Sequence, residues 1–487
     1  MLAGDGDDQI SVTVDSDQSS FLINVNGTEY RYSQSEVDYI NVLGRGGDDS
    51  ITVDLGTEND TVSTHANGLN AINDKFRISA SGFSTVDVSG GGGHDVVSLA
   101  DSRGQDRLTG RSTAEGYSAT LTNGNYRSTV TGFDLAFIAS TGGGDTADVV
   151  GTSGDDVFVS RGFHNALRVA GTNLVFNHFA EVSVDGGGGN DRANLNDSAG
   201  NQHYVLTPRA GTIFSANSTV SVNDFARVNA FATSGNDTVE LRDSIRSSSN
   251  NDDIFDSRDG VNLLYGDGYQ LYASGFDNVE AVSTGGSDIA QIFDTAGNDL
   301  LYSRGGDAEL VSGNQTVAAK DFRVVNLVAN RGGFDRAFVT GSSDTDVVRS
   351  NNTVRVVNSE GQTNRIRNAE SVNVNLSQVV AQSISTQSLD SLAESFDEAE
   401  FETTLQMLQL TNAENANETG GQDADDLEDL DLLESLGDQA KSYMGDGTLS
   451  AEDKAVMEAR SVDDAIADYS LEAIDYLYAL RGQSGKK

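Results

Sequence analysis

The stretch that decides the fold is Gly90-Gly91-Gly92-Gly93-His94-Asp95-Val96-Val97-Ser98, where a glycine-rich turn leads through an aspartate into alternating residues. Its Gly-x-Asp core returns along the chain at intervals of 46 to 51 residues. The seven aspartates of this first set are Asp49, Asp95, Asp145, Asp191, Asp237, Asp288 and Asp335. A period of this length over seven copies predicts a stacked solenoid or a propeller rather than a globular enzyme core.

A second set of acidic residues lies 11 residues after the first, at Asp60, Asp106, Asp156, Asp299 and Asp346. Gln202 takes this place once, and Asp253 is displaced by a five-residue insertion near residues 246–250. A phenylalanine keeps a fixed place in six units, at Phe83, Phe133, Phe179, Phe225, Phe276 and Phe322. The constant offset between the two sets predicts one continuous solenoid over residues 1–378, with two aspartate ladders along its corners.

Short alternating runs rich in β-branched residues separate the glycine-rich stretches, as in Val97-Ser98-Leu99 and Val157-Phe158-Val159. They predict strands, and Gly, Asn, Asp and Ser at the joints predict turns. About four strands per unit fit two turns of a coil or one propeller blade. We favour the coil, because such blades usually carry a tryptophan signature and the chain has no tryptophan. The predicted fold class is all-β: a parallel β-solenoid of about seven 46–51-residue repeats with a small acidic α-helical C-terminal module.

Three segments are predicted along the chain. Residues 1–378 hold the repeats, and we expect them to begin in mid-repeat, because Asp8 has the place of a second-set aspartate without its first half. Residues 379–426 are predicted to form a helix and an acidic linker, and residues 427–487 a small helical module, since apolar residues recur there at helical spacing. Within it, residues 445–453 resemble half of an EF-hand loop, for which a helix-capping turn is the simpler interpretation.

Composition limits the classes of partner that the chain is expected to bind. The 487 residues carry a net charge of −44, so nucleic acid and anionic membranes are disfavoured and cations are the natural small partners. No stretch approaches the roughly 18 apolar residues that span a bilayer, and no signal peptide is visible at the start. Because there is no cysteine, disulfides and thiol chemistry are excluded.

The glycine-aspartate motif resembles the hemolysin-type, or RTX, calcium-binding repeat. Residues 90–98 fit the nonapeptide throughout, and residues 186–194 fit except for Ala193 at the apolar position. The resemblance implies that glycine carbonyls and aspartate carboxylates ligate Ca²⁺ at turns of a parallel β-roll. The metal ligands it implies are Gly91, Gly93, Asp95, Gly187, Gly189, Asp191, Asp49, Asp145, Asp156, Asp237, Asp288, Asp299 and Asp335. With corners 11 and then about 35 residues apart, the chain is more similar to long bacterial β-solenoid surface proteins with scattered Gly-x-Asp corners.

Two interpretations of these corners stay open. Aspartates at turns can accept backbone N–H groups and close the corner without metal. Alternatively, some corners ligate Ca²⁺, most of all around Asp95 and Asp191, where glycine is densest. Stacked aspartates repel one another, and cations are one way to relieve that repulsion.

The function expected from the sequence is structural. We predict a non-enzymatic, secreted or cell-surface adhesive repeat protein, with calcium as its ion and extracellular polysaccharide or self-association as further partners. The rival is a carbohydrate-active β-helix enzyme, a polysaccharide lyase or hydrolase, which an off-register cluster of Asp, Arg and His on one sheet face would favour. The five histidines show no metal-ligand spacing, and no Gly-x-Ser-x-Gly elbow or phosphate loop is present.

Overall fold

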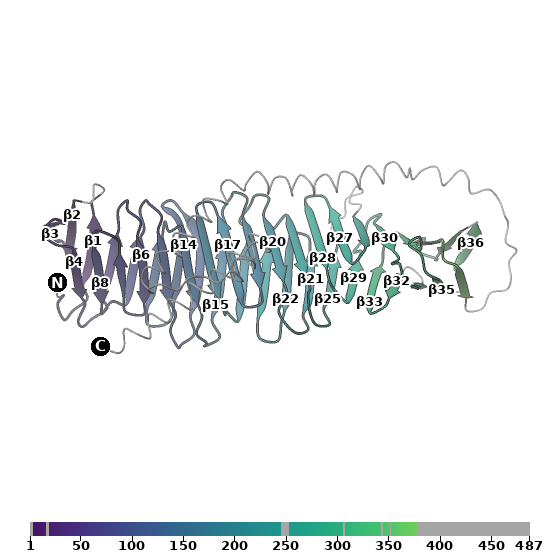
Figure 1. Cartoon of the computed structure of the whole chain (residues 1–487), viewed down its shortest axis with the longest axis horizontal. Coiled ribbons are helices and arrows are strands. Elements are labelled where there is room, and N and C mark those ends of the chain that lie inside the picture. Colours follow the sequence, from purple (N-terminus) through teal and green to yellow (C-terminus); the bar gives the residue numbers. More distant parts are fainter. Residues whose placement is uncertain are drawn as a thin grey trace, which may run out of the picture. The chain divides into compact units, whose positions relative to one another are not determined.

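A computed structural model describes residues 3–15, 19–244, 253–304, 307–341, 344–350 and 352–376, all within one compact unit, residues 1–380. These residues form 39 β-strands in a 20-stranded and a 19-stranded sheet, stacked along one axis (Figure 1), and no helix occurs among them. The predicted all-β solenoid is therefore confirmed. The predictions for residues 379–426 and 427–487 lie outside the described residues. No helix able to span a bilayer is found in the described part of the chain.

The 20-stranded sheet, sheet 1, contains β1 (Gln9–Val14), β2 (Ser20–Val25), β3 (Thr28–Ser33), β5 (Ser50–Asp54), β9 (Thr85–Ser89), β11 (Arg107–Thr113), β12 (Gly116–Thr122), β13 (Arg127–Thr131), β15 (Thr146–Val150), β19 (Glu181–Asp185), β21 (His203–Thr207), β22 (Ala210–Phe214), β23 (Thr219–Asn223), β25 (Thr238–Arg242), β29 (Asn278–Val282), β31 (Leu300–Arg304), β32 (Asp307–Ser312), β33 (Gln315–Lys320), β35 (Arg336–Gly341) and β39 (Ser371–Leu376).

The 19-stranded sheet, sheet 2, contains β4 (Tyr39–Leu43), β6 (Thr61–His65), β7 (Gly68–Ile72), β8 (Arg77–Ser81), β10 (Val96–Ala100), β14 (Leu135–Ala139), β16 (Val157–Arg161), β17 (His164–Val169), β18 (Thr172–Asn177), β20 (Arg192–Asn196), β24 (Arg227–Phe231), β26 (Ile254–Arg258), β27 (Val261–Gly266), β28 (Tyr269–Ser274), β30 (Ile289–Phe293), β34 (Val324–Val328), β36 (Asp346–Ser350), β37 (Thr353–Val357) and β38 (Thr363–Arg367).

The repeat unit has five strands rather than about four. Strands β4 and β5 cross singly between the sheets, and β6–β8 then form an antiparallel meander within sheet 2. The next unit repeats this pattern with the sheets exchanged, since β9 and β10 cross singly and β11–β13 form their meander in sheet 1. Between units the strands pair in parallel, as β5 does with β9. We call each passage of the chain through the two sheets a rung of the coil.

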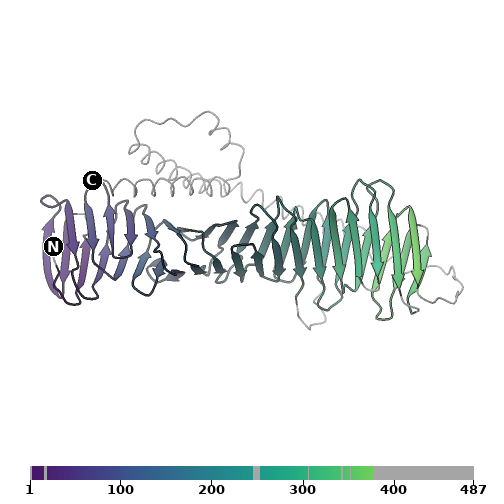
Figure 2. The ribbon, with the colours of Figure 1, turned by 90° about the horizontal axis from the view of Figure 1, so that it is seen from below.

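The core lies between the two sheets, whose layered strands Figure 2 shows from below. Strand residues alternate between the inside and the surface, so that Ile51 and Val53 of β5 are fully buried while Thr52 is exposed. The six repeated phenylalanines are all buried in this core. Each contributes about 1.5–3 kcal/mol by leaving water, so the repeated aromatic position is a packing feature.

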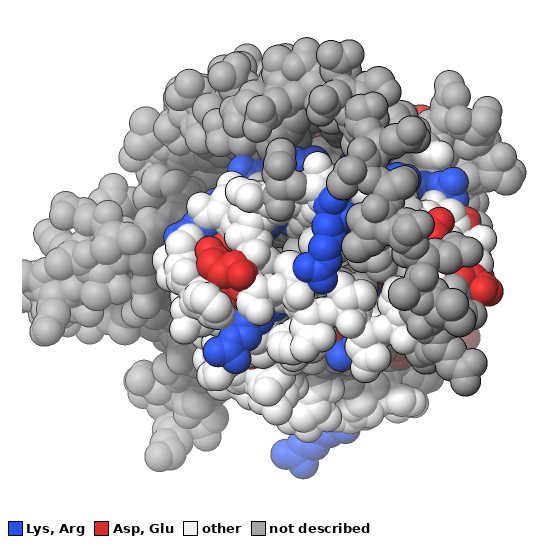
Figure 3. Space-filling view, turned by 90° about the vertical axis from the view of Figure 1, so that its right-hand side faces the viewer, with Lys and Arg blue, Asp and Glu red and all other residues white. Residues whose placement is uncertain are grey.

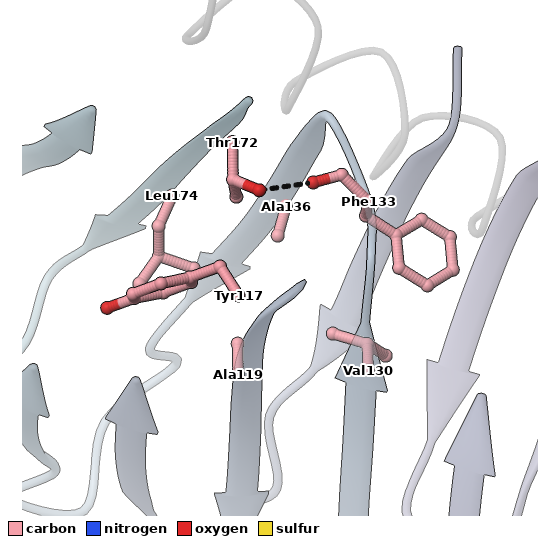
Figure 4. Close-up of a pocket in the computed structure, with 7 residues that line it drawn as sticks. All are labelled: Tyr117, Ala119, Val130, Phe133, Ala136, Thr172 and Leu174. Carbon is pink, nitrogen blue, oxygen red and sulfur yellow. Dashed lines mark hydrogen bonds between the residues drawn. The ribbon is translucent and has the colours of Figure 1, made fainter. Parts of the chain in front are cut away.

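A small apolar gap lies inside the solenoid between β12, β13, β14 and β18 (Figure 4). It is lined by Tyr117, Ala119, Val130, Phe133, Ala136, Thr172 and Leu174. The Thr172 hydroxyl donates to the carbonyl oxygen of Phe133 at 2.9 Å, and the Tyr117 hydroxyl donates to that of Val150 at 2.8 Å. Because both hydroxyls already donate to backbone carbonyl oxygens, we interpret this gap as a packing defect rather than a ligand site.

Candidate metal centres

Each first-set aspartate directly precedes a strand and binds the neighbouring rung. Its Oδ1 accepts the backbone N–H of a second-set residue 35 to 41 positions earlier, at 2.7–2.8 Å. The pairs are Asp8–Asp49, Asp60–Asp95, Asp106–Asp145, Asp156–Asp191, Gln202–Asp237, Asp253–Asp288 and Asp299–Asp335. The aspartates therefore close corners by hydrogen bonding between rungs, as the metal-free interpretation predicts.

These pairs show how the two predicted ladders are composed: one runs along each edge of the solenoid, and each contains residues of both sets. Asp49 precedes β5 and Asp60 follows it, so the 11-residue offset carries the chain from one edge of the solenoid to the other. Residues of the two sets meet in mixed pairs, alternating between the two edges. In the last described unit, Asp346 is the exposed first residue of β36, and the buried Thr345 takes the corner place.

The motif glycines have a structural role. Gly93 and Gly189 have φ angles of 118° and 119°, which favour glycine. A Cβ on Gly93 would lie 2.5 Å from the carbonyl oxygen of Glu58, and one on Gly189 would lie 2.4 Å from that of Gly154. Gly91 and Gly187 approach the neighbouring rung just as closely, with an added Cβ 1.9 and 2.5 Å from a carbonyl oxygen. Close packing of backbone on backbone thus accounts for the Gly-x-Asp pattern without a metal.

A third acidic position, which the sequence analysis missed, lies six residues after the first-set aspartate. Asp101, Asp197, Asp243 and Asp294 occupy it. Their carboxylates accept the backbone N–H of the next rung, from Thr141, Thr233, Thr284 and Arg331 respectively. Leu55 and Gly151 stand in this place at the two most glycine-rich corners. A recurring aspartate six residues beyond the motif is the signal that would have revealed this position.

Three corners gather three carboxylates each. In each group, one carboxylate oxygen from every member lies within 4.8 Å of those of the other two members. We call the groups the Asp145 triad (Asp101, Asp106, Asp145), the Asp288 triad (Asp243, Asp253, Asp288) and the Asp335 triad (Asp294, Asp299, Asp335). Two unit charges 4.8 Å apart repel by about 3.5 kcal/mol at an effective dielectric of 20. Protons, hydrogen bonds or a cation must offset this repulsion.

The sequence-predicted ligands divide between these triads and other corners. Asp145, Asp288, Asp299 and Asp335 belong to triads. Asp49, Asp95, Asp156, Asp191 and Asp237 lie at corners where the described residues form no such triad. The dense glycines Gly91, Gly93, Gly187 and Gly189 flank the Asp95 and Asp191 corners, so the carboxylates gather away from them. Whether any of these residues binds calcium stays a prediction.

Hydrogen bonds hold the Asp145 triad in place. Asp106 accepts the hydroxyls of Ser102 at 2.6 Å and Tyr126 at 2.7 Å, and the Ser140 hydroxyl donates to Asp145 at 2.6 Å. Burial, followed by the adjacent Asp106 carboxyl group among the smaller causes, raises the pKa of Asp101 to about 6. Oδ1 of Asp101 has no hydrogen-bond partner.

All three carboxylates of the Asp288 triad are buried, as are those of the Asp335 triad. The Ser283 hydroxyl donates to Asp288 at 2.6 Å, and the Ser244 hydroxyl donates to Asp253 at 3.0 Å. Burial first and the carboxyl group of Asp288 second raise the pKa of Asp243 to about 7. The surroundings of this triad therefore favour the neutral form of Asp243, and a bound cation would favour the charged form instead.

The Asp335 triad lacks the serine. Ala329, which directly follows β34, takes the place that Ser140 takes after β14 and Ser283 after β29. Asp299 accepts the backbone N–H of Thr295 at 2.8 Å, and Asp294 accepts that of Arg331 at 3.0 Å. Burial is the largest cause that raises the pKa of both Asp294 and Asp335.

The corners outside the triads also disfavour charged carboxylates. Burial raises the pKa of Asp95 to about 8, that of Asp60 to about 7 and that of Asp191 to about 6. Oδ2 of Asp60 and Oδ2 of Asp191 have no hydrogen-bond partner. A proton can satisfy such a pair, because one neutral carboxyl group removes most of the repulsion.

The end of the solenoid that carries β36 gathers several basic residues. Figure 3 looks onto this end, where blue Lys and Arg side chains stand among white uncharged residues and a few red acidic ones. Arg355 of β37 lies opposite Arg365 of β38, and Arg367 follows on the same strand. Burial, then Arg367 and Arg355, lower the pKa of Arg365. The surface charge of the described residues is thus uneven despite the net charge of −44.

All side-chain ligands that the triads offer are oxygens. Hard oxygen donors favour Ca²⁺ or Mg²⁺ over the softer transition metals. In each triad two carboxylates come from one rung and the third from the next, so a bound ion would join neighbouring rungs. No protein-family model matches the chain, and no curated protein matches it. The geometry of the corners therefore carries the functional argument.

Proposed function

We propose that this chain is a non-enzymatic structural or adhesive protein, secreted or displayed at the cell surface, whose solenoid is stiffened by Ca²⁺ at the aspartate triads. The observation that carries the proposal is the gathering of three carboxylates from two rungs at each of three corners, all of them buried except the half-buried Asp101. Solenoid rungs contact only their neighbours, so an ion shared by two rungs acts directly on the interface that sets stability.

The proposed ion supports an extracellular location. Extracellular calcium modules bind with dissociation constants of about 10⁻⁴–10⁻³ M, which match weak sites with few protein ligands. A surface with a net charge of −44 also attracts such ions from solution. Extracellular polysaccharide and self-association are the further partners that we propose.

A structural role agrees with how the acids are used. The buried carboxylates that stand out in the sequence are engaged in corner hydrogen bonds at the sheet edges. A glycosidase would need two carboxylates on either side of a bound sugar. This use of the acids supports the structural proposal over a carbohydrate-active enzyme.

Thermal unfolding followed by circular dichroism tests the proposal. We expect Ca²⁺ at saturation to raise the melting temperature relative to EDTA, with about 2.7 kcal/mol for each site at 100 times its dissociation constant. A variant that combines Asp101→Asn, Asp243→Asn and Asp294→Asn should lose this effect, and Asp60→Asn, which lies outside the triads, should retain it. A melting temperature of the unaltered chain that does not respond to Ca²⁺ would contradict the proposal.

A further inference from the structure

The Asp288 triad forms although an insertion lengthens the segment between two of its aspartates. Asp101 and Asp106 are five residues apart, as are Asp294 and Asp299, but ten residues separate Asp243 from Asp253. The three carboxylates nevertheless meet within the same 4.8 Å as in the uninterrupted corners. The arrangement of acids at this corner is thus independent of the length of the segment between them.

One carboxylate in this triad has an oxygen that no hydrogen bond satisfies. Asp243 is 2% exposed, and its Oδ1 accepts the backbone N–H of Thr284 at 2.7 Å. Its Oδ2 has no hydrogen-bond partner. The Asp243 side chain also interacts with the carboxyl group of Asp288, which after burial is the next cause that raises its pKa. Leaving such an oxygen buried and unpaired is costly, and a cation would supply what it lacks.

We propose that the Asp288 triad binds one hard divalent cation, Ca²⁺ in preference to Zn²⁺, and that it binds more tightly than the other two triads. This inference rests on the proposed function and names its principal site. Asp243, Asp253 and Asp288 supply the carboxylates, and the hydroxyl oxygens of Ser244 and Ser283 lie beside them. The ion joins the base of the insertion to the following rung, because Asp243 and Asp253 flank residues 244–252 and Asp288 lies on the next rung.

The chain contains a matched corner that lacks one of these charges. Asp197 and Asp237 occupy the places of Asp243 and Asp288, but Gln202 replaces the second-set aspartate. Both oxygens of Asp197 are already engaged by donors from Thr233 and Ser234. This corner, with two carboxylates and a neutral amide, is expected not to bind the ion and serves as an internal control.

Terbium luminescence excited through tyrosine tests the site in the full chain. Tyr269 lies next to Asp253: burial first, and then this carboxylate, raise the pKa of the tyrosine. We expect Tb³⁺ emission that Ca²⁺ displaces and Zn²⁺ does not. Asp243→Asn should weaken the apparent affinity by about tenfold or more, since even outer-sphere changes at metal sites cost that much. Asp197→Asn, the matched control, should leave the emission unchanged.

Two further variants keep the test informative if Asp243→Asn folds poorly. Tyr269→Phe should lower the emission while calorimetry still detects Ca²⁺ with unchanged affinity. Gln202→Asp completes a fourth triad beside Tyr204, whose hydroxyl is near Asp197 and Asp237, and should add emission. Unchanged emission in both variants would overturn the inference.

Failure of this inference is distinguishable from failure of the proposed function. If Ca²⁺ raises the melting temperature but Asp243→Asn leaves Tb³⁺ and Ca²⁺ affinity unaltered, the function stands and this site assignment falls. If Asp243→Asn abolishes the part of the Tb³⁺ emission that Tyr269→Phe also removes, but Ca²⁺ leaves the melting temperature of the unaltered chain unchanged, the site stands and the stiffening role falls.

Discussion

The Asp191 corner and the Asp288 triad occupy equivalent places in sheet 2, before β20 and β30, yet different residues build the turn at each. At Asp191 the chain uses Gly186 and Gly187, and Asp191 pairs with Asp156 without forming a triad among the described residues. Before Asp288 the equivalent residues are Ser283 and Thr284, which hydrogen-bond Asp288 and Asp243. Closeness to the Gly-Asp consensus therefore does not identify where charges gather, because glycine provides room for backbone whereas hydroxyl residues hold additional carboxylates.

The largest effect should come from the glycine-rich corner itself. Gly188 and Gly189 share a φ of 119°, but only Gly189 approaches the next rung, where an added Cβ would lie 2.4 Å from the carbonyl oxygen of Gly154. We expect Gly189→Ala to lower the free energy of unfolding by about 3 kcal/mol or more, and Gly188→Ala by about 1 kcal/mol. Urea unfolding measures both. Equal losses would show that φ strain alone, and not the contact between rungs, demands glycine.

The next effect separates the two corners by their response to calcium. Asp288→Asn should remove about 2.7 kcal/mol of calcium-dependent stabilisation at 100 times the dissociation constant, because a triad carboxylate is lost. Asp191→Asn should leave the response to calcium intact. Melting temperatures in Ca²⁺ and in EDTA provide the comparison. A larger loss of calcium-dependent stabilisation in Asp191→Asn than in Asp288→Asn would indicate that calcium binds at the glycine-rich corners instead.

A shallower effect concerns pH at the Asp95 corner, which is of the same glycine-rich type. Burial raises the pKa of Asp95 from an ordinary 3.8 to about 8, so the folded state retains a proton that the unfolded state releases. Its contribution to stability is complete below about pH 4 and is lost as pH rises to about 8. In EDTA we expect the melting temperature to fall across this window, and to fall less in Asp95→Asn. An identical slope in both proteins would show that Asp95 does not carry the effect.

The smallest effect is expected where the repeat fades. Asp346 is exposed at the start of β36, while Thr345 is buried at the corner. Asp346→Ala should change the free energy of unfolding by no more than about 0.5 kcal/mol. Thr345→Ala removes a buried hydroxyl and methyl and should cost more. A reversal of this order in denaturant unfolding would place Asp346 at the corner after all.

The period of the sequence was sufficient to predict the solenoid but not the number of strands in its unit. A unit of 46 to 51 residues holds four longer or five shorter strands, and the tight turn between β11 and β12 leaves no Gly-x-Asp signal. The 11-residue offset was visible, but which residues it brings together depends on that strand count. Asp243 was missed because no glycine precedes it, and its importance arises only from the rung on which Asp288 lies.

The odd number of strands in a unit has a consequence for how such a chain can change in length. Each added unit turns everything that follows it by half a revolution, because successive meanders alternate between the two sheets. Deleting one unit would keep the pattern of strand pairing between neighbouring units. The surfaces of all the repeats that follow it would then face the opposite side. Deleting two would restore the original orientation. Whether the number of units between two repeats is even or odd thus decides whether those repeats present their meanders in the same sheet or in opposite sheets.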